Sequence, residues 1–128
     1  MVRALDDAAS SDAERRLKVP PNSVEAEQSL LGGLLQDSEA WDHIADIVLA
    51  ADFCRKDHCL IFSAIASLAG EGHPCDVVTV SEYLDNRNEL VAAGGLEYLA
   101  TLANETPGAA NARAYAQILR EKSTLRSL

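Results

Sequence analysis

The sequence has few cysteines, few aromatic residues and no long apolar run. Its three cysteines cannot all pair within one chain, and none forms a C-x-x-C motif, which excludes a disulfide framework of the secreted kind. No apolar run is long enough to span a bilayer, and the opening MVRALDDAASSDAERR lacks the apolar core of a signal peptide. We therefore expect a soluble cytoplasmic protein with no membrane contact.

Basic residues are also scarce. The chain has 11 Lys and Arg against 20 Asp and Glu, a formal net charge of −9. A surface that grips phosphates needs clustered cations, so the charge argues against tight DNA binding. No glycine directly precedes a lysine, so the G-x-x-x-x-G-K loop that cradles nucleotide phosphates is missing. We expect no catalytic residue, cofactor or metal in this chain.

Aliphatic residues, by contrast, are abundant. The hydrophobic share is 48% while aromatics make up 5%, so the core must be built from Leu, Ile, Val and Ala. Their spacing predicts an all-α fold, a compact bundle of about six helices with a protruding C-terminal helix. We expect residues 1–18 to be a disordered tail, residues 19–108 a globular helical head, and residues 109–128 the projecting helix.

Local signals place the first two helices. Asn22 followed by Glu25 is typical of a capping-box start, and Gly32 with Gly33 predicts a close helix–helix contact. The apolar stripe of this helix is Leu30, Leu31, Leu34 and Leu35. A second helix is predicted from Ser38, with an inner face made of Trp41, Ile44, Ala45, Val48 and Leu49.

Further along, the segment CDVVTV is predicted to be an extended lead-in to a helix that Thr79 and Glu82 cap. That helix carries Asn86, Arg87 and Asn88, which a DNA reader could use. It also carries acidic residues that repel phosphates, so we interpret it as a solvated face. These acidic residues are Glu82, Asp85 and Glu89.

The stretch DHCLIFSAIASL raises two chemical alternatives. A zinc site could draw on nearby donors, although their spacings do not form paired knuckles. The donors are Cys54, His58, Cys59, His73 and Cys75. A Cys–His nucleophile is disfavoured, because His58 and Cys59 would point about 100° apart on a helix. Cys54 and His58 could meet if the helix began early, but only the neighbouring Asp57 could then orient the imidazole. We interpret Cys59 as filling a small slot and His58 as hydrogen-bonding near the helix start. A small helical metal-binding or DNA-binding regulatory domain remains the alternative function.

The last segment is different in character. It traces a narrow apolar stripe flanked by charges, which is typical of a helix that pairs with another helix. The stripe consists of Tyr115, Ile118, Leu119, Lys122 and Leu125. No stop signal precedes Leu128, and we expect the chain to be cut from a longer one.

Several segments together resemble a known family. VPPNSVEAEQSLLGGLL, DFCRKDHCLIFSAI, DVVTV, GGLEYL and NETPGAANARAYAQILREKSTLRSL follow in order. Residues 19–128 thereby resemble the N-terminal domain of bacterial replicative DNA helicases of the DnaB type. The chain departs from that pattern at three positions, where Cys54 replaces a common aromatic, Cys59 a common polar or basic residue, and Gly108 a frequent Ser or Thr.

The resemblance implies a role as a collar domain. The parent would be a hexameric ring that unwinds DNA 5′ to 3′ with ATP and Mg²⁺, and its motor domain would lie beyond Leu128. Heads and hairpins would pair as dimers, with residues 109–128 as the first hairpin helix. Primase, in some bacteria a helicase loader, and single-stranded DNA passing through the ring would be the other partners. The interface residues we predict are Tyr98, Tyr115, Ile118, Leu119, Lys122 and Leu125. For Tyr98, an ordinary half-buried surface position is the alternative.

Overall fold

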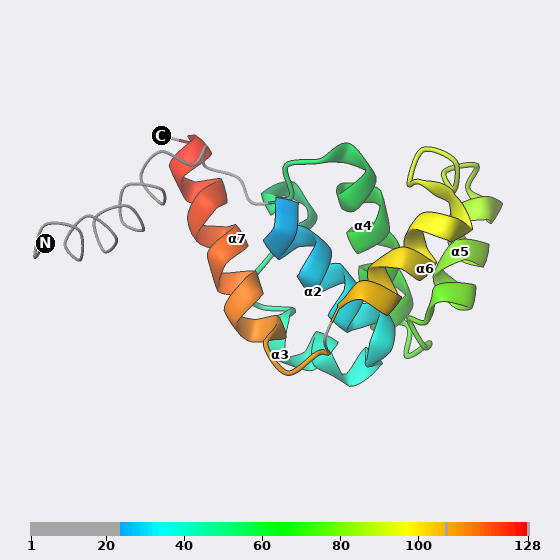
Figure 1. The fold of residues 1–128 in the computed structure, drawn as a ribbon, viewed down its shortest axis with the longest axis horizontal. Coiled ribbons are helices and arrows are strands. Elements are labelled where there is room, and N and C mark those ends of the chain that lie inside the picture. Colours follow the sequence, from blue (N-terminus) through cyan, green and yellow to red (C-terminus); the bar gives the residue numbers. More distant parts are fainter. Residues whose placement is uncertain (1–23, 107, 128) are drawn as a thin grey trace, which may run out of the picture.

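The computed structural model describes residues 24–106 and 108–127, and within these ranges it contains six α-helices, two short 3-10 helices and no strand (Figure 1). The prediction of an all-α bundle is therefore confirmed. The predicted tail over residues 1–18 and the capping residue Asn22 lie outside the described residues. The α-helices are α2 (Val24–Gln36), α3 (Trp41–Ile44), α4 (Lys56–Gly70), α5 (Val77–Asn86), α6 (Gly95–Glu105) and α7 (Ala112–Ser127). None of these helices combines the length and apolar character needed to cross a membrane.

Helix α2 lies at the centre of the bundle. Leu30, Leu31 and Leu34 are completely buried on it, as the leucine stripe predicted. Helices α6 and α7 both pack against α2, while α5 packs on α4 and α6. In Figure 1, α7 and α5 consequently lie on opposite sides of the molecule.

The two glycines of α2 mark the helix–helix contact that the sequence predicted. A Cβ on Gly32 would lie 2.7 Å from Cβ of Thr106, and one on Gly33 would lie 3.2 Å from Cα of Ala109. The contact at Gly32 leaves no room for a side chain and the one at Gly33 is tight, so the end of α6 and the turn after it cross directly over the α2 backbone.

The predicted second helix is broken, and this corrects the sequence interpretation. The 3-10 helix η1 (Ser38–Ala40) leads into the single turn α3, and a second 3-10 helix, η2 (Ala50–Asp52), follows. Between them the backbone of Leu49 is extended, and its N–H donates to Oδ2 of Asp52 at 2.7 Å. Ile44 and Val48 face the core as predicted, but Ala45 and Leu49 are exposed.

Helix α5 begins earlier than predicted. Oδ1 of Asp76 accepts a hydrogen bond from the backbone N–H of Thr79 at 2.8 Å, so Asp76 is the N-cap and Val77 is already helical. The prediction of an extended lead-in capped by Thr79 is thus wrong. The carboxylate of Asp76 satisfies an N–H that the first turn of a helix otherwise leaves without a partner.

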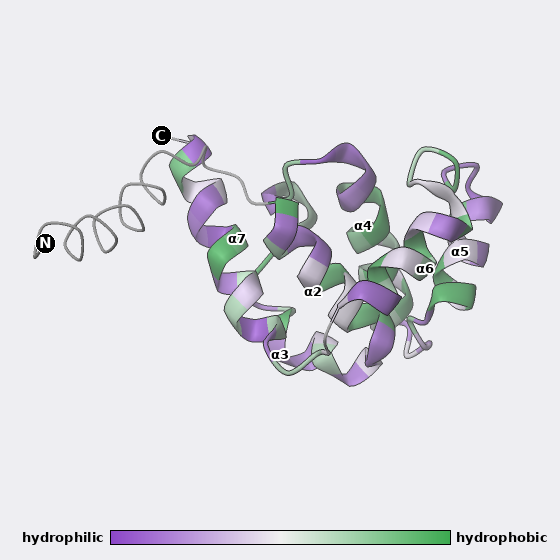
Figure 2. Ribbon diagram, viewed as in Figure 1, coloured by the Kyte–Doolittle hydropathy of each residue, from purple (hydrophilic) through white to green (hydrophobic). Residues whose placement is uncertain are grey.

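Helix α7, predicted to protrude, lies at the outer edge of the bundle. One face packs on α2, through the buried side chains of Ala112, Ala116 and Leu119. Its colours in Figure 2 accordingly alternate between hydrophobic and hydrophilic along its length. Nη1 of Arg120 donates to Oδ1 of the buried Asp52 at 3.1 Å, and Arg126 donates to the backbone carbonyl of Asp52 at 2.9 Å. These contacts fasten α7 to the η2 turn.

Candidate interaction groove

An open groove of about 470 Å³ runs between α2, α6 and α7. Its apolar lining includes Tyr98 and Leu102 from α6 and Tyr115 and Ile118 from α7. We call this hollow the interaction groove. Tyrosine is one of the residue types that contribute most of the binding energy at protein interfaces.

The structure brings three of the six predicted interface residues together at this groove. Tyr98, Tyr115 and Ile118 all line it, and Ile118 is 38% exposed. Leu119 instead lies in the core with 1% of its surface exposed, so a polar replacement there would damage the fold. Lys122 is half-buried and Leu125 is exposed, and neither lines the groove.

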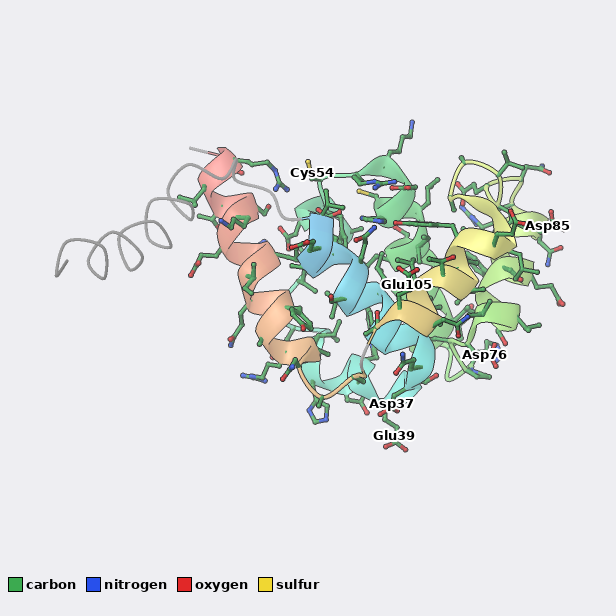
Figure 3. The ribbon with its side chains drawn as sticks, viewed as in Figure 1. Asp37, Glu39, Cys54, Asp76, Asp85 and Glu105 are labelled. Carbon is green, nitrogen blue, oxygen red and sulfur yellow. The ribbon has the colours of Figure 1, made fainter. Side chains whose placement is uncertain are left out.

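The polar rim of the groove is acidic. Glu25 and Glu105 line it, and no Lys or Arg is among the lining residues. Figure 3 shows Glu105 near the crossing of α6 and α2, away from the other labelled acidic side chains. A partner that fills the groove would meet these two carboxylates among polar and apolar side chains.

A buried polar relay reaches the groove from the core. Oε1 of Glu27 lies 2.6 Å from Nδ1 of His58, and Nε2 of His58 lies 2.6 Å from the Tyr98 hydroxyl. Glu27 and His58 are both completely buried. Each ring nitrogen of His58 therefore has an oxygen atom within hydrogen-bond distance. We call Glu27, His58 and Tyr98 the polar relay.

An ion pair lies beside the polar relay. Arg55 donates to both carboxylate oxygens of Asp57, and its guanidinium carbon lies 5.8 Å from the centre of the Tyr98 ring. Partial burial raises the pKa of the Asp57 carboxyl, but the Arg55 hydrogen bond and nearby charges outweigh it and hold that pKa below its usual range. Oδ1 of Asp57 also accepts the backbone N–H of His58 at 2.8 Å.

His58 and Cys59, two of the five donors considered for a zinc site, make other hydrogen bonds. Both ring nitrogens of His58 are engaged, and the Cys59 thiol donates to the carbonyls of Ala50 and Phe53 at 3.3 and 3.4 Å. Cys75 is buried, while Cys54 is exposed near the start of α4 (Figure 3). Across residues 24–106 and 108–127, no three His, Cys, Asp or Glu side chains gather as a metal site would require.

The nucleophile and DNA-reader alternatives gain no support from the geometry. Burial raises the pKa values of the Cys59 and Cys75 thiols, which disfavours the reactive thiolate. Arg87 lies over the Tyr83 ring at 5.5 Å and donates to Glu89 at 3.3 Å. His58 hydrogen-bonds near the helix start, as the sequence interpretation held, and Cys59 is half-buried.

Sequence reasoning missed Glu27. The residue sits three positions before Leu30 and four before Leu31, so it falls on the apolar stripe of α2. A charged residue on a buried helical face needs a partner inside the protein. A charged residue within the apolar stripe was therefore the feature of the sequence that could have revealed the site. The partner of Glu27 is His58 on α4.

The comparisons with known proteins agree with this structure. The family model described as "DnaB-like helicase N terminal domain" matches residues 19–121. The "Replicative DNA helicase DnaB" of Haemophilus influenzae is 43% identical over 120 residues, which are 93% of this chain and 26% of that protein. The protein of the same description from Buchnera aphidicola subsp. Schizaphis graminum is 49% identical over 92 residues, or 72% of this chain and 20% of the relative.

A solved structure has the same fold. The "Crystal structure of the N-terminal domain of DnaB helicase from Mycobacterium tuberculosis" matches with a TM-score of 0.81 at 44% identity. The match covers 84% of this chain and 76% of that one. The chain spans about a fifth to a quarter of the length of the curated relatives it matches. With a family model matched over most of the described residues, the chain belongs to the family of DnaB-like helicase N-terminal domains.

Proposed function

We propose that this chain is the collar domain of a cytoplasmic replicative DNA helicase, where it mediates self-association and couples the ring to primase. Membership of the DnaB-like family and similarity to replicative DNA helicases support this proposal. The parent would be a hexamer that unwinds DNA 5′ to 3′ around a single strand. Residues 109–128 would be the first helix of a dimerisation hairpin, and a helicase loader would be a further partner in some bacteria.

ATP and Mg²⁺ would act elsewhere in the parent protein. The residues present here do not fit a nucleotide, because no glycine directly precedes a lysine anywhere in the chain. We therefore assign no step of ATP hydrolysis to these residues and treat the chain as a docking element.

The observation that carries the proposal is the convergence of Tyr98, Tyr115 and Ile118 on the interaction groove. These side chains come from two helices that both pack on α2, so a rigid scaffold presents them. Tyrosine combines a large apolar ring with a polar tip, and it is enriched where proteins bind each other tightly.

Replacing Ile118 by Asp tests the docking role. The change places a charge in the groove wall, and we expect it to weaken self-association or primase capture by about tenfold. Because Ile118 is 38% exposed, the melting temperature should change little. Sedimentation equilibrium measures self-association, and pull-down with purified primase measures coupling.

The matched control is Val91→Asp. Val91 is 91% exposed and does not line the groove, so this change adds the same charge at a different surface. Both associations should survive it. If Ile118→Asp leaves both associations at wild-type strength, the groove is not a docking surface.

A further inference from the structure

Tyr98 presents its ring to the interaction groove while its hydroxyl is hydrogen-bonded to a fully buried imidazole. We infer that Glu27 and His58 are positioning residues, which fix the Tyr98 ring in the groove wall before a partner arrives. The inference rests on the proposed docking function, and it explains how the contact residue Tyr98 is held in place for a partner.

The relay begins at a fixed point. Oε2 of Glu27 accepts the backbone N–H of Cys54 at 2.6 Å, and Oε1 lies 2.6 Å from Nδ1 of His58. The His58 backbone N–H in turn donates to Asp57. The imidazole is thus held at its ring and at its own backbone, and it cannot turn without breaking a buried hydrogen bond.

The imidazole then holds the tyrosine. Nε2 of His58 lies 2.6 Å from the Tyr98 hydroxyl, and Gln28 donates to the same hydroxyl at 3.3 Å. The two rings are nearly parallel, at 6°, with centroids 5.8 Å apart. The hydroxyl is therefore engaged by the protein itself, and what Tyr98 offers to the groove is the ring.

The backbone before α6 makes room for this position. Gly94 has φ +105°, and a Cβ there would lie 2.7 Å from Cβ of Tyr98 and 2.9 Å from its Cγ. Any other residue would be strained and would push the ring away. Gly94 therefore leaves the space that Tyr98 occupies, and the hydroxyl contacts hold the far end of the side chain.

Stability alone is a poor explanation for the Glu27–His58 pair. A buried charged or polar pair commonly gains no stability over apolar residues of similar volume. Fixing a side chain beforehand has a separate benefit, because a partner then meets a surface that has already lost its rotamer freedom. The relay connects α2, α4 and α6, and its free end is the predicted contact residue.

The test compares variants that release the ring with one that only weakens the core. Tyr98→Phe keeps the ring and removes the hydroxyl, and Glu27→Leu combined with His58→Leu removes the relay but keeps apolar volume. Ile65→Ala is the control, since Ile65 is fully buried on α4 two turns beyond His58. Tyr98→Ala measures what the ring itself contributes to binding.

Two readouts separate positioning from ordinary packing. NMR side-chain couplings should show one χ1 rotamer at position 98 in the wild-type chain and in Ile65→Ala, and averaging in Tyr98→Phe and in the double variant. Self-association or primase capture should weaken about fivefold or more when the ring is released, and stay unchanged in Ile65→Ala despite its lower melting temperature. If the double variant does not fold, Tyr98→Phe decides alone.

Other outcomes overturn the inference. A single rotamer at position 98 in Tyr98→Phe would mean that the relay does not hold the ring. An equal loss of association in Ile65→Ala would mean that general stability is the cause. If Tyr98→Ala has no effect while Ile118→Asp weakens association, the docking function survives and the positioning role fails. If neither change has an effect, the proposed docking function itself fails.

Discussion

Gly32 of α2 lies directly under Thr106 at the end of α6, so that a Cβ on Gly32 would overlap the Thr106 hydroxyl and the Leu102 carbonyl. The Thr106 hydroxyl donates to that same carbonyl at 2.9 Å, and its position is therefore fixed. This crossing brings α6 into close contact with α2, and both helices line the interaction groove.

Gly32→Ala should destabilise the chain by about 2 kcal/mol, because overpacking outweighs the gain in helix propensity. Urea unfolding followed by circular dichroism measures the change. Gly70→Ala is the control, since nothing lies within 4 Å of a Cβ at the end of α4. That change should be neutral or slightly stabilising, and equal effects at the two sites would contradict the crossing geometry.

Asp76 should make the stability of α5 depend on pH. Hydrogen bonding to Thr79 lowers the pKa of the Asp76 carboxyl below its ordinary value of 3.8. A carboxyl with a lowered folded pKa stabilises the fold fully above its unfolded pKa, and this contribution disappears as the pH falls through the folded pKa. Asp76→Ala should cost about 1 kcal/mol at neutral pH.

Asp76→Asn isolates the charge, because Asn is an equally good cap that does not titrate in this range. Its unfolding free energy at neutral pH should be close to that of the wild-type chain. The difference between the two should change between about pH 5 and pH 2. Parallel stability curves over that range would show that the Asp76 charge contributes nothing.

Arg120→Ala should loosen α7. The buried carboxylate of Asp52 would lose its hydrogen bond to a cation, although Leu49 would still donate to it. Because Arg120 is itself about half exposed, we expect a modest loss of about 1 kcal/mol in unfolding free energy. Arg113→Ala, at an exposed position on the same helix, is the control and should change stability by less than about 0.5 kcal/mol. A loss as large in the control would rule out a specific contact.

The isolated chain should neither hydrolyse ATP nor bind single-stranded DNA tightly. The absent phosphate loop and the net charge of −9 are the physical reasons. A coupled ATPase assay should show no turnover, and fluorescence anisotropy should give a Kd weaker than about 1 µM at physiological salt. Turnover that survives repurification, or submicromolar binding, would contradict the docking role.

The periodic spacing of apolar residues predicted the helices correctly where burial in the core alone determines the structure. Leu30, Leu31 and Leu34 are buried because a helix places every third and fourth residue on one side. The segment after Ser38 has a similar period, yet α3 ends at Ile44, and Asp52 accepts the Leu49 N–H at the start of η2. A side-chain hydrogen bond from three residues ahead leaves no trace in hydrophobic spacing.

The candidate site was partly predictable for the same reason. Ile118 and Leu119 are neighbours in the stripe, but successive helical residues point about 100° apart. One therefore lines the groove and the other enters the core. The link from Glu27 to His58 joins residues 31 positions apart, and only the folded chain brings them within hydrogen-bond distance.

The hydrogen bonds from Arg120 and Arg126 to Asp52 affect how α7 would respond to a pulling force. A pull along the axis of α7 would not peel the helix away one contact at a time. It would be resisted in shear, because the η2 turn holds both arginines while Leu119 is wedged in the core. Tension applied to α7 would thus pass to the centre of the head.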